Sequence, residues 1–412
     1  MTATLATPSL HAPTLAQNSL AKLHVLTLTP FYPSCGDEIS GCFVAESLQQ
    51  VQSQGVTSSV IAVDSIYRSA RKTSPQFAAE WLRYPQLPGN FGLSTAGNFL
   101  GAVLVNKVRQ LHRRSPVHLI HAHAALPCGH AAMFLARSIG IPYVVTIHGL
   151  DVFNSCFQTG FAARWRRKSS QRVYANAAKV ICISEKVRQS LTNADFHSPG
   201  SQPVKTQPFK TEVVYNGTDT ELFAPGAAAQ TVAPNLLMVG NLLAGKGQEL
   251  ALQAIAAIKD SYPDLRCTII GEGADRHRFI TLAKDLNISS RVDFLGRRSR
   301  REVAEAMRNC SIFVLPSRYE GLGCVYLEAM SCGKPVIACR GQGIDEIISH
   351  RINGWLIPVD GLKELIEGLQ TLLPNPALRA SIGQAARTTI VNDFTLTHQA
   401  RHLARIYQEA AP

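Results

Sequence analysis

Short apolar runs alternate with helical patterns along most of this chain, and the alternation limits the folds that it can adopt. In the first half, six runs are short enough to be buried strands, and turn signals or helical patterns separate them. Buried strands that alternate with helices predict an α/β fold with a doubly wound parallel sheet. The expected strands are Leu23–Leu28, Ser59–Val63, His118–His121, Pro142–Ile147, Val180–Ser184 and Glu212–Tyr215.

The alternation is interrupted at Pro225–Pro234, which has the Ala-, Pro-, Gly- and Gln-rich composition of a linker, and it then restarts. Because 412 residues are too many for one typical core, we expect two Rossmann-like domains facing each other across a cleft. The helix expected at Thr395–Ala410 would cross back to the first domain. The expected units are a disordered tail (1–20), an N-terminal domain (21–222), a C-terminal domain (223–392) and the returning segment (393–412).

Three further local expectations follow from the first half of the chain. Residues 65–98 are rich in prolines and glycines and are expected to be irregular, as a mobile or functional loop. Residues 100–114 form a basic amphipathic helical pattern, and a helix of small residues is expected at 124–139.

Composition and charge restrict the class of protein and its partners. The net charge of +12 favours anionic partners such as nucleotides or anionic lipid. Ten scattered cysteines without paired spacing are typical of reduced thiols in a cytosolic protein. No apolar run approaches the roughly 20 residues of a spanning helix. Nucleic acid is not expected, because there is no recognised binding module and aromatic residues make up only 7%.

The stretch Ser311–Gly333 reads as strand, glycine loop and helix. Free N–H groups at the start of such a helix can hold an anion, and Gly321 and Gly323 let the backbone approach closely. Glu320 precedes the helix, and Glu328 is expected about two turns into it. Taken alone, this stretch also fits an ordinary α/β turn with solvated glutamates.

Other candidate residues follow strand ends in both halves, where ligands bind in open α/β sheets. His148 and Asp151 follow one expected strand, and Lys246 lies in a glycine-rich turn after another. His121 and His123 would share one face of a strand, a spacing compatible with a metal site, but no third ligand is evident. No G-x-G-x-x-G follows the first strand, which disfavours a dinucleotide-dependent dehydrogenase.

Six motifs follow one another along residues 22–410. The most specific is Glu320-x7-Glu328 within PSRYEGLGCVYLEAMSCGKPVIA. The others are VVTIHGLD (144–151), VVYNGTD (213–219), VGNLLAGKG (239–247), IIGEG (269–273) and DEIISHRINGWLIP (345–358). With these motifs in this order, the chain resembles the retaining glycosyltransferases of family 4, which have the GT-B fold.

The resemblance implies roles for residues of the second domain, which would bind a UDP- or GDP-linked sugar. Glu328 would hold the ribose hydroxyls. Glu320 would bind the sugar ring, aided by the amides of Gly321, Leu322 and Gly323. Lys246 would neutralise the diphosphate. The backbone near Gly240, Gly271–Gly273 and Leu295–Arg297 would recognise the nucleotide.

The chain departs from the family pattern at two points. Asn241 stands where the family usually has an arginine, so Arg297 or Arg298 would have to supply that charge. The usual glycine pair after the first strand appears as Ser40-Gly41, and Gly41 would let the backbone approach donor or acceptor. His148 matches the family histidine near the donor sugar, whereas Asp151 fits either the site or a helix cap.

No residue presents itself as a covalent nucleophile, so we expect a retaining front-face displacement that uses no metal or other cofactor. The acceptor would be a hydroxyl of a lipid-linked or saccharide molecule in polysaccharide or glycolipid synthesis. Basic clusters at Arg68–Lys72, Lys107–Arg114 and Arg164–Lys168 fit either contact with an anionic membrane or a solvated face. The expected location is cytoplasmic, or peripheral at the inner face of the membrane.

Two alternatives remain open at this stage. One is a nucleotide-sugar epimerase or hydrolase with the same fold. The other is a non-catalytic protein that binds sugar nucleotides, which the Asn241 departure favours and the retained Glu320, Glu328, Lys246 and His148 oppose.

Overall fold

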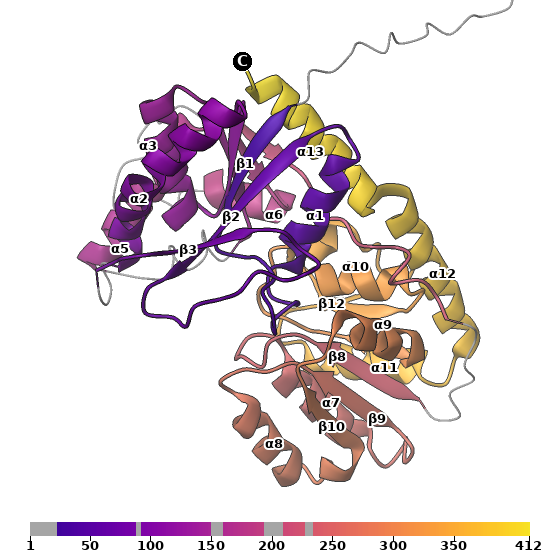
Figure 1. Ribbon diagram of the computed structural model, residues 1–412. Coiled ribbons are helices and arrows are strands. Elements are labelled where there is room, and N and C mark those ends of the chain that lie inside the picture. Colours follow the sequence, from indigo (N-terminus) through magenta and orange to yellow (C-terminus); the bar gives the residue numbers. More distant parts are fainter. Residues whose placement is uncertain (1–22, 88–91, 150–159, 193–208, 227–233) are drawn as a thin grey trace, which may run out of the picture.

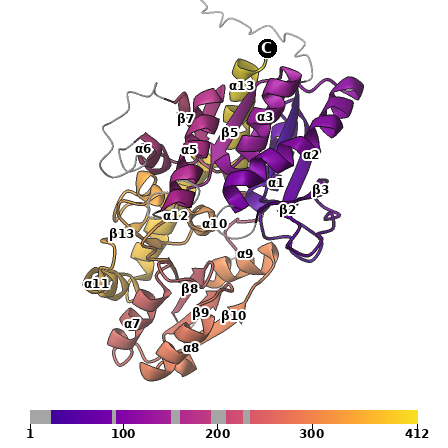
Figure 2. The same cartoon turned by 90° about the vertical axis from the view of Figure 1, so that its left-hand side faces the viewer.

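The computed structural model describes residues 23–87, 92–149, 160–192, 209–226 and 234–412, and the tail expected at 1–20 lies outside these ranges. The described chain forms two parallel sheets with helices on their faces, and the first domain lies above the second in Figures 1 and 2. The predicted pair of doubly wound α/β domains is therefore confirmed.

The first sheet has seven strands in the order β3-β2-β1-β4-β5-β6-β7. The order reverses direction beside β1, where β2 lies on one side and β4 on the other, as in doubly wound folds. The strands are β1 (His24–Thr29), β2 (Thr57–Ser65), β3 (Glu80–Tyr84), β4 (Leu119–His123), β5 (Tyr143–Ile147), β6 (Lys179–Cys182) and β7 (Thr211–Val213).

Helices cover both faces of this sheet because alternate residues of its central strands are buried on opposite sides. Leu26 and Ile120 pack toward α2 (Gly92–Arg114) and α3 (His130–Ile139), whereas Val25 and Leu119 pack toward the C-terminal helix α13 (Leu396–Ala410). Strands buried on both faces explain the continuous apolar runs in the sequence. The helices of this part are α1 (Cys42–Gln52), α2 (Gly92–Arg114), α3 (His130–Ile139), α5 (Phe161–Asn176) and α6 (Glu185–Thr192), with a kinked turn η2 (Ala125–Gly129) before α3.

The second sheet has six strands in the order β10-β9-β8-β11-β12-β13, all parallel. The strands are β8 (Asn235–Val239), β9 (Arg266–Ile270), β10 (Val292–Gly296), β11 (Ile312–Val314), β12 (Val336–Cys339) and β13 (Trp355–Ile357). The helices are α7 (Gln248–Ile258), α8 (Arg276–Asp285), α9 (Arg300–Asn309), α10 (Cys324–Ser331), α11 (Leu362–Leu372) and α12 (Pro376–Asp393), with 3-10 turns η4 (Ser289–Arg291) and η5 (Gly343–Glu346).

The last helix, α13 (Leu396–Ala410), crosses back to the first domain as predicted (Figure 1). Thr395 caps its N-terminus, and its buried face includes Leu403, Ile406 and Tyr407. Burying a large apolar side chain stabilises a fold by about 1.5–3 kcal/mol. This apolar face therefore joins the end of the chain firmly to β1, β4 and β5.

Polar contacts also join the two domains beside α6. Glu346, at the end of η5, accepts hydrogen bonds from the backbone N–H groups of Glu185 and Lys186 at 2.8 and 2.6 Å, and from Tyr215 at 2.9 Å. A carboxylate at a helix N-terminus satisfies otherwise unpaired donors and interacts favourably with the helix dipole. The second domain thus caps a helix of the first.

The local structure differs from the sequence prediction in two places. Within 65–98, which was expected to be irregular, β3 pairs in parallel with β2 and α2 already begins at Gly92. β3 lies at the sheet edge with only Tyr84 buried, so its sequence lacks the apolar run of a central strand. The helix expected from 124 begins as α3 only at His130, because Pro127 favours the extended backbone that Leu126 adopts.

None of the helices in the described residues is both long enough and apolar enough to cross a membrane.

Gly217 gives a test of the return of α13 to the first domain. A Cβ at this position would lie 2.3 Å from the backbone oxygen of Thr395, and the Gly217 N–H donates to Gln399 of α13 at 2.9 Å. We expect Gly217→Ala to lower the free energy of unfolding by about 1–3 kcal/mol, because backbone atoms must shift to relieve the overlap. Denaturant unfolding measures the change.

Gly226→Ala is the matched control. Its added methyl group would meet only the flexible side chain of Arg308, at 3.1 Å. Equal stability of the two variants would contradict the close fit of Gly217 against the start of α13.

Candidate active site

The predicted residues of the second domain meet where β8 and β11 end. Lys246 lies in the loop between β8 and α7, and Glu320 lies in the loop between β11 and α10. Their side chains form an ion pair, with exposed fractions of 28% and 13% respectively. The structure thus brings together two of the three residues predicted to be catalytic.

Backbone contacts hold these two loops in place. A Cβ at Gly247 would lie 2.4 Å from the backbone oxygen of Pro316, and φ at Gly247 is +85°, so both space and conformation require glycine there. The Glu320 N–H donates to the Gln342 side chain at 3.0 Å, and the Gly343 N–H donates to the Glu320 carbonyl at 3.1 Å. These backbone contacts therefore hold the two loops that carry Lys246 and Glu320 in position beside each other.

The loop from Gly321 to Gly323 leads directly into α10, as predicted. Gly323 takes the N-cap position in a left-handed conformation with φ of +82°, and Leu322 is buried. The first turn of a helix leaves N–H groups without acceptors inside the helix, which suits a bound anion. The start of α10 therefore offers N–H groups to an anion, while Gly321 packs closely against the backbone of His148 and Gly323 against the ring of Tyr326.

His148 brings the first domain to the same place. It follows β5, and a Cβ on Gly321 would lie 3.0 Å from its carbonyl oxygen. Its Nε2 shares a hydrogen bond of 2.9 Å with Nδ1 of His123, and the rings of Phe31 and Phe43 contact it edge-on. Burial lowers the pKa of His148 to about 4, so the imidazole is neutral at pH 7.

A row of buried histidines extends from His148 toward α13. His121 forms hydrogen bonds of 2.7 Å with the hydroxyls of Tyr407 and Thr146, and its ring lies beside that of His123. Burial lowers the pKa of His121 to about 3 and that of His123 well below its ordinary value. Within the described ranges, no group of three or more His, Cys, Asp or Glu side chains is placed to hold a metal ion.

Two comparisons identify the family. Residues 43–222 match the family described as Glycosyltransferase Family 4, and residues 224–389 match Glycosyl transferases group 1. The chain is 31% identical to an uncharacterized glycosyltransferase of Methanocaldococcus jannaschii over 268 residues, which is 65% of this chain and 69% of the relative. The chain belongs to the family 4 glycosyltransferases.

Other relatives and solved structures agree with this assignment. A D-inositol 3-phosphate glycosyltransferase of Corynebacterium kroppenstedtii is 29% identical, with 71% of this chain and 67% of the relative covered. The sucrose-phosphate synthase of Thermosynechococcus elongatus has a similar fold, with a TM-score of 0.75, 21% identity and coverage of 94% and 98% of the two chains. Anabaena HepE also has a similar fold, with a TM-score of 0.71, 19% sequence identity and coverage of 94% of this chain and 99% of HepE. The glycosyltransferase therefore has the GT-B fold.

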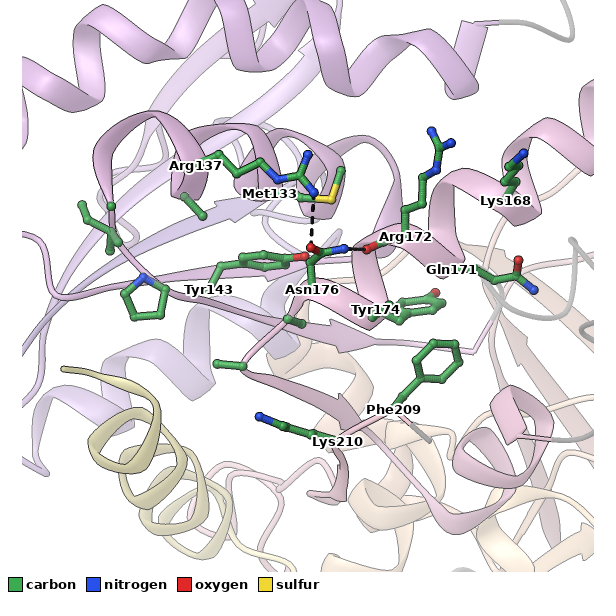
Figure 3. Close-up of a pocket in the computed structure, with 17 residues that line it drawn as sticks. Met133, Arg137, Tyr143, Lys168, Gln171, Arg172, Tyr174, Asn176, Phe209 and Lys210 are labelled. Carbon is green, nitrogen blue, oxygen red and sulfur yellow. Dashed lines mark hydrogen bonds between the residues drawn. The ribbon is translucent and has the colours of Figure 1, made fainter. Parts of the chain in front are cut away.

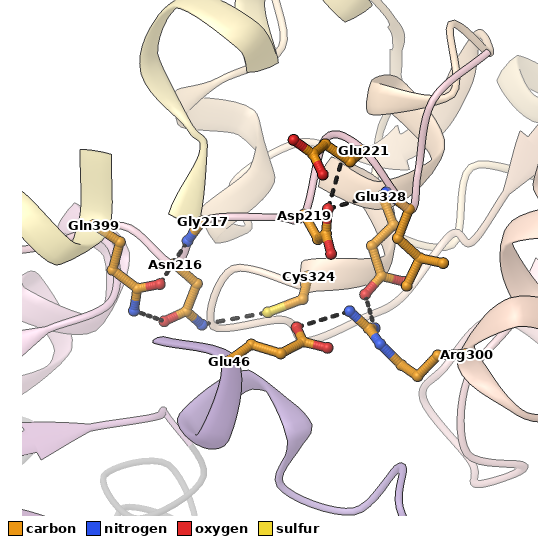
Figure 4. Close-up of polar contacts among 10 residues, drawn as sticks. Glu46, Asn216, Gly217, Asp219, Glu221, Arg300, Cys324, Glu328 and Gln399 are labelled. Atoms are coloured by element: carbon orange, nitrogen blue, oxygen red, sulfur yellow. Dashed lines mark hydrogen bonds and ion pairs between the residues drawn. The ribbon is translucent and has the colours of Figure 1, made fainter. Parts of the chain in front are cut away.

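Glu328 is in an environment that sequence reasoning did not foresee. It is the fifth residue of α10, little more than one turn into the helix rather than two, and only 4% exposed. Its carboxylate pairs with Arg300, whose guanidinium also binds Glu46 of α1 at 2.8 Å (Figure 4). Arg300 further lies 4.8 Å above the ring of Phe223. One arginine thus bridges carboxylates from the two domains.

The pKa of Glu46, at the first-domain end of this bridge, is raised to about 7. Burial is the main cause and Glu328 adds repulsion, while Arg300 opposes both. No local motif identifies Glu46 or Arg300, because their 254 residues of separation carry no readable pattern.

The two cations considered as replacements for the missing family arginine have other partners. Arg297 binds Asp37 of the first domain at 3.1 Å, and Arg298 lies 3.8 Å from Glu302. The side chain of Asn241 is exposed, while its carbonyl accepts a hydrogen bond from Gln248 at 3.1 Å. A role for Arg297 or Asn241 in binding the nucleotide stays a prediction.

The remaining predicted residues have clear packing roles. A Cβ on Gly271 would lie 1.9 Å from the Gly240 carbonyl, and one on Gly273 would lie 2.2 Å from that of Leu242. These contacts bring the ends of β8 and β9 together at the predicted nucleotide side. Gly41 begins α1 with φ of +79° and packs against the backbone of Phe31 and Tyr32. Asp151 lies outside the described residues.

Glu46 gives a pH-dependent test of the interdomain bridge. Because its pKa in the folded chain is raised to about 7 from 4.5, the folded state binds more protons than the unfolded state between these values. Stability contributed by this group is therefore present below about pH 4.5 and is lost as pH rises through 7. We expect the wild type to lose on the order of 1–3 kcal/mol of unfolding free energy across this window.

Glu46→Gln should flatten this dependence, because glutamine fills the same space without titrating. Denaturant unfolding at several pH values measures it, with Glu367→Gln on the exposed face of α11 as the control. Parallel pH profiles for the wild type and Glu46→Gln would contradict the raised pKa.

Proposed function

We propose that this glycosyltransferase moves a sugar, with retention of configuration, from a UDP- or GDP-linked donor to a hydroxyl of a saccharide or lipid-linked acceptor. The observation that carries the proposal is the Lys246–Glu320 pair beside the Gly321–Gly323 loop, next to His148 of the other domain. Anabaena HepE, which has a similar fold, was solved in complex with UDP and glucose. That complex supports a sugar nucleotide as the donor here.

The ion pair itself has a role in donor binding. When a diphosphate enters, its oxygens compete with Glu320 for the Lys246 ammonium, which leaves the Glu320 carboxylate to accept hydrogen bonds from sugar hydroxyls. Lys246 and the N-terminus of α10 then stabilise the charge that builds on the departing diphosphate. The exchange of partners keeps both residues paired before and after the donor binds.

The mechanism we propose is front-face displacement. Glu328 is turned to Arg300, so it is not placed as the second carboxylate of a close catalytic pair with Glu320. The leaving diphosphate would take the proton from the acceptor hydroxyl, and the new glycosidic bond would form on the face from which the phosphate departs. Neutral His148 would orient the sugar by hydrogen bonding and not by charge.

Glu328 would hold the ribose, as the family resemblance implies. Because Arg300 already binds its carboxylate, ribose hydroxyls would share Glu328 with Arg300 or displace it. Arg300 would thus connect donor binding to the contact with Glu46 on the first domain.

The acceptor side would include the basic clusters of the first domain, which also favour peripheral contact with an anionic membrane at its cytoplasmic face. In the structure, Arg68 and Arg71 pair with Asp64, and Lys107 pairs with Glu80. These pairs reduce the charge offered by two of the clusters. Flotation with neutral and with anionic vesicles tests the membrane contact.

A thermal-shift screen of UDP, GDP, ADP and their sugars tests the donor class. Saturating donor should raise the melting temperature by on the order of a few degrees, because it binds only the folded chain. We expect Lys246→Met to lose most of this shift, since it removes the charge that faces the diphosphate. If no sugar nucleotide stabilises the chain at millimolar concentration, the proposed donor class is wrong.

Glu320→Gln tests the catalytic assignment. The variant should keep its fold but lose turnover by on the order of 100-fold or more, because the amide has one acceptor oxygen in place of two, presents a donor NH2 to the sugar and carries no charge. Transfer measured with the donor from the screen gives the loss, and Glu367→Gln serves as the control for removing a carboxylate. Normal turnover would exclude Glu320 from the mechanism.

A further inference from the structure

A second hollow lies on the first domain, away from the candidate active site. It has a volume of about 1070 Å³, slightly above the roughly 300–1,000 Å³ typical of ligand pockets. Its walls are the C-terminal halves of α3 and α5 and the segment that enters β7 (Figure 3). It is thus assembled from three separate parts of the chain.

The hollow is at the opposite edge of the sheet from His148. Tyr143, which lines it, is the first residue of β5, whereas His148 follows the last residue of that strand. At about 3.3 Å per residue, these two ends of β5 are roughly 13 Å apart. A ligand in this hollow would therefore not occupy the cleft between the domains.

The charged side chains around the hollow are all positive. Arg137, Lys168, Arg172 and Lys210 line it, and its described lining includes no aspartate or glutamate. In Figure 3 Lys210 faces the hollow from the side opposite to the other three. Cations that converge on one space repel one another, and an anion between them relieves the repulsion.

These four cations differ from others on the same domain. Lys179 and Arg405 each pair with Glu212, and Lys107 pairs with Glu80. Among the residues that the structure describes, by contrast, none of the four forms a salt bridge. Their field reaches the neighbouring His130, whose pKa is lowered first by burial and then by Arg172 and Arg137.

The floor of the hollow is aromatic. Tyr143 and Tyr174 are buried, and the rings of Tyr174 and Phe209 meet edge-on with centroids 5.7 Å apart. Tyr143 is fixed by a hydrogen bond from its hydroxyl to the Val173 carbonyl, and Asn176 links α5 to Arg137 at 3.2 Å. A rigid apolar floor beneath a cationic rim suits a ligand with an anionic end and an apolar or ring-shaped part.

We propose that this hollow is a binding site for a phosphate- or diphosphate-bearing ligand, separate from the donor site. The exposed guanidinium and ammonium groups of the rim bind the phosphate oxygens, and the aromatic floor packs against the remainder. The same chemistry is offered by a soluble phosphorylated compound and by a phospholipid headgroup. The experiment below distinguishes these two sources.

Hydrogen–deuterium exchange on the full chain with sodium pyrophosphate tests the soluble source. Binding should slow amide exchange in peptides covering residues 168–178 and 209–213, whereas binding in the cleft would protect the segments around 246 and 320. The double variant Lys168→Gln/Arg172→Gln should weaken the protection of the first group by about tenfold or more, since it removes two charge-assisted contacts. Both residues are exposed, so the variant should fold.

Flotation tests the lipid source, with vesicles of phosphatidylcholine alone or mixed with phosphatidic acid. The control is Arg113→Gln/Arg114→Gln, which removes the same charge from the exposed end of α2. If pyrophosphate slows exchange in the control but not in Lys168→Gln/Arg172→Gln, the result supports a soluble ligand. If the control binds vesicles with phosphatidic acid and Lys168→Gln/Arg172→Gln does not, the result supports a lipid headgroup. If neither probe binds, or if both variants lose binding equally, the proposal is overturned.

Discussion

The guanidinium of Arg300 is the interaction on which the arrangement of the two domains most depends. It lies between Glu328 in the second domain and Glu46 in the first, and the flat face of Phe223 supports it. Breaking a partly buried ion pair by removing one partner is costly, because a charge is left without compensation. The relative position of the domains is thus coupled to the charge state of a few residues beside the proposed ribose site.

Other polar contacts surround this bridge. Arg297 reaches Asp37, Glu346 caps α6, and the Ser184 hydroxyl donates to the Gly321 carbonyl at 2.5 Å. Contacts of this kind exchange readily with water or ligand, unlike an apolar interface. Polar contacts thus hold the domains together beside the candidate active site, whereas the apolar face of α13 joins them at the far side of the first sheet.

The sequence predicted the fold well, because strands and helices alternate in short local patterns. Lys246 and Glu320 were singled out in glycine-rich loops that follow two strands, and the structure places their side chains in contact. Their roles stay a prediction. Glu46 and Arg300 were missed, because their pairing depends on how two domains are placed and not on spacing along the chain. The edge strand β3 was missed for a different reason, since a half-exposed strand lacks an apolar run.

The position of α13 has a consequence for how this chain is made. Tyr407, near the end of α13, is fully buried against β4, and its hydroxyl shares a hydrogen bond with the ring of His121. During synthesis the strands of the first sheet emerge from the ribosome long before this helix does, so the sheet face that α13 covers stays open until residues 396–410 have been made. A chain interrupted before these residues would expose that apolar face to aggregation.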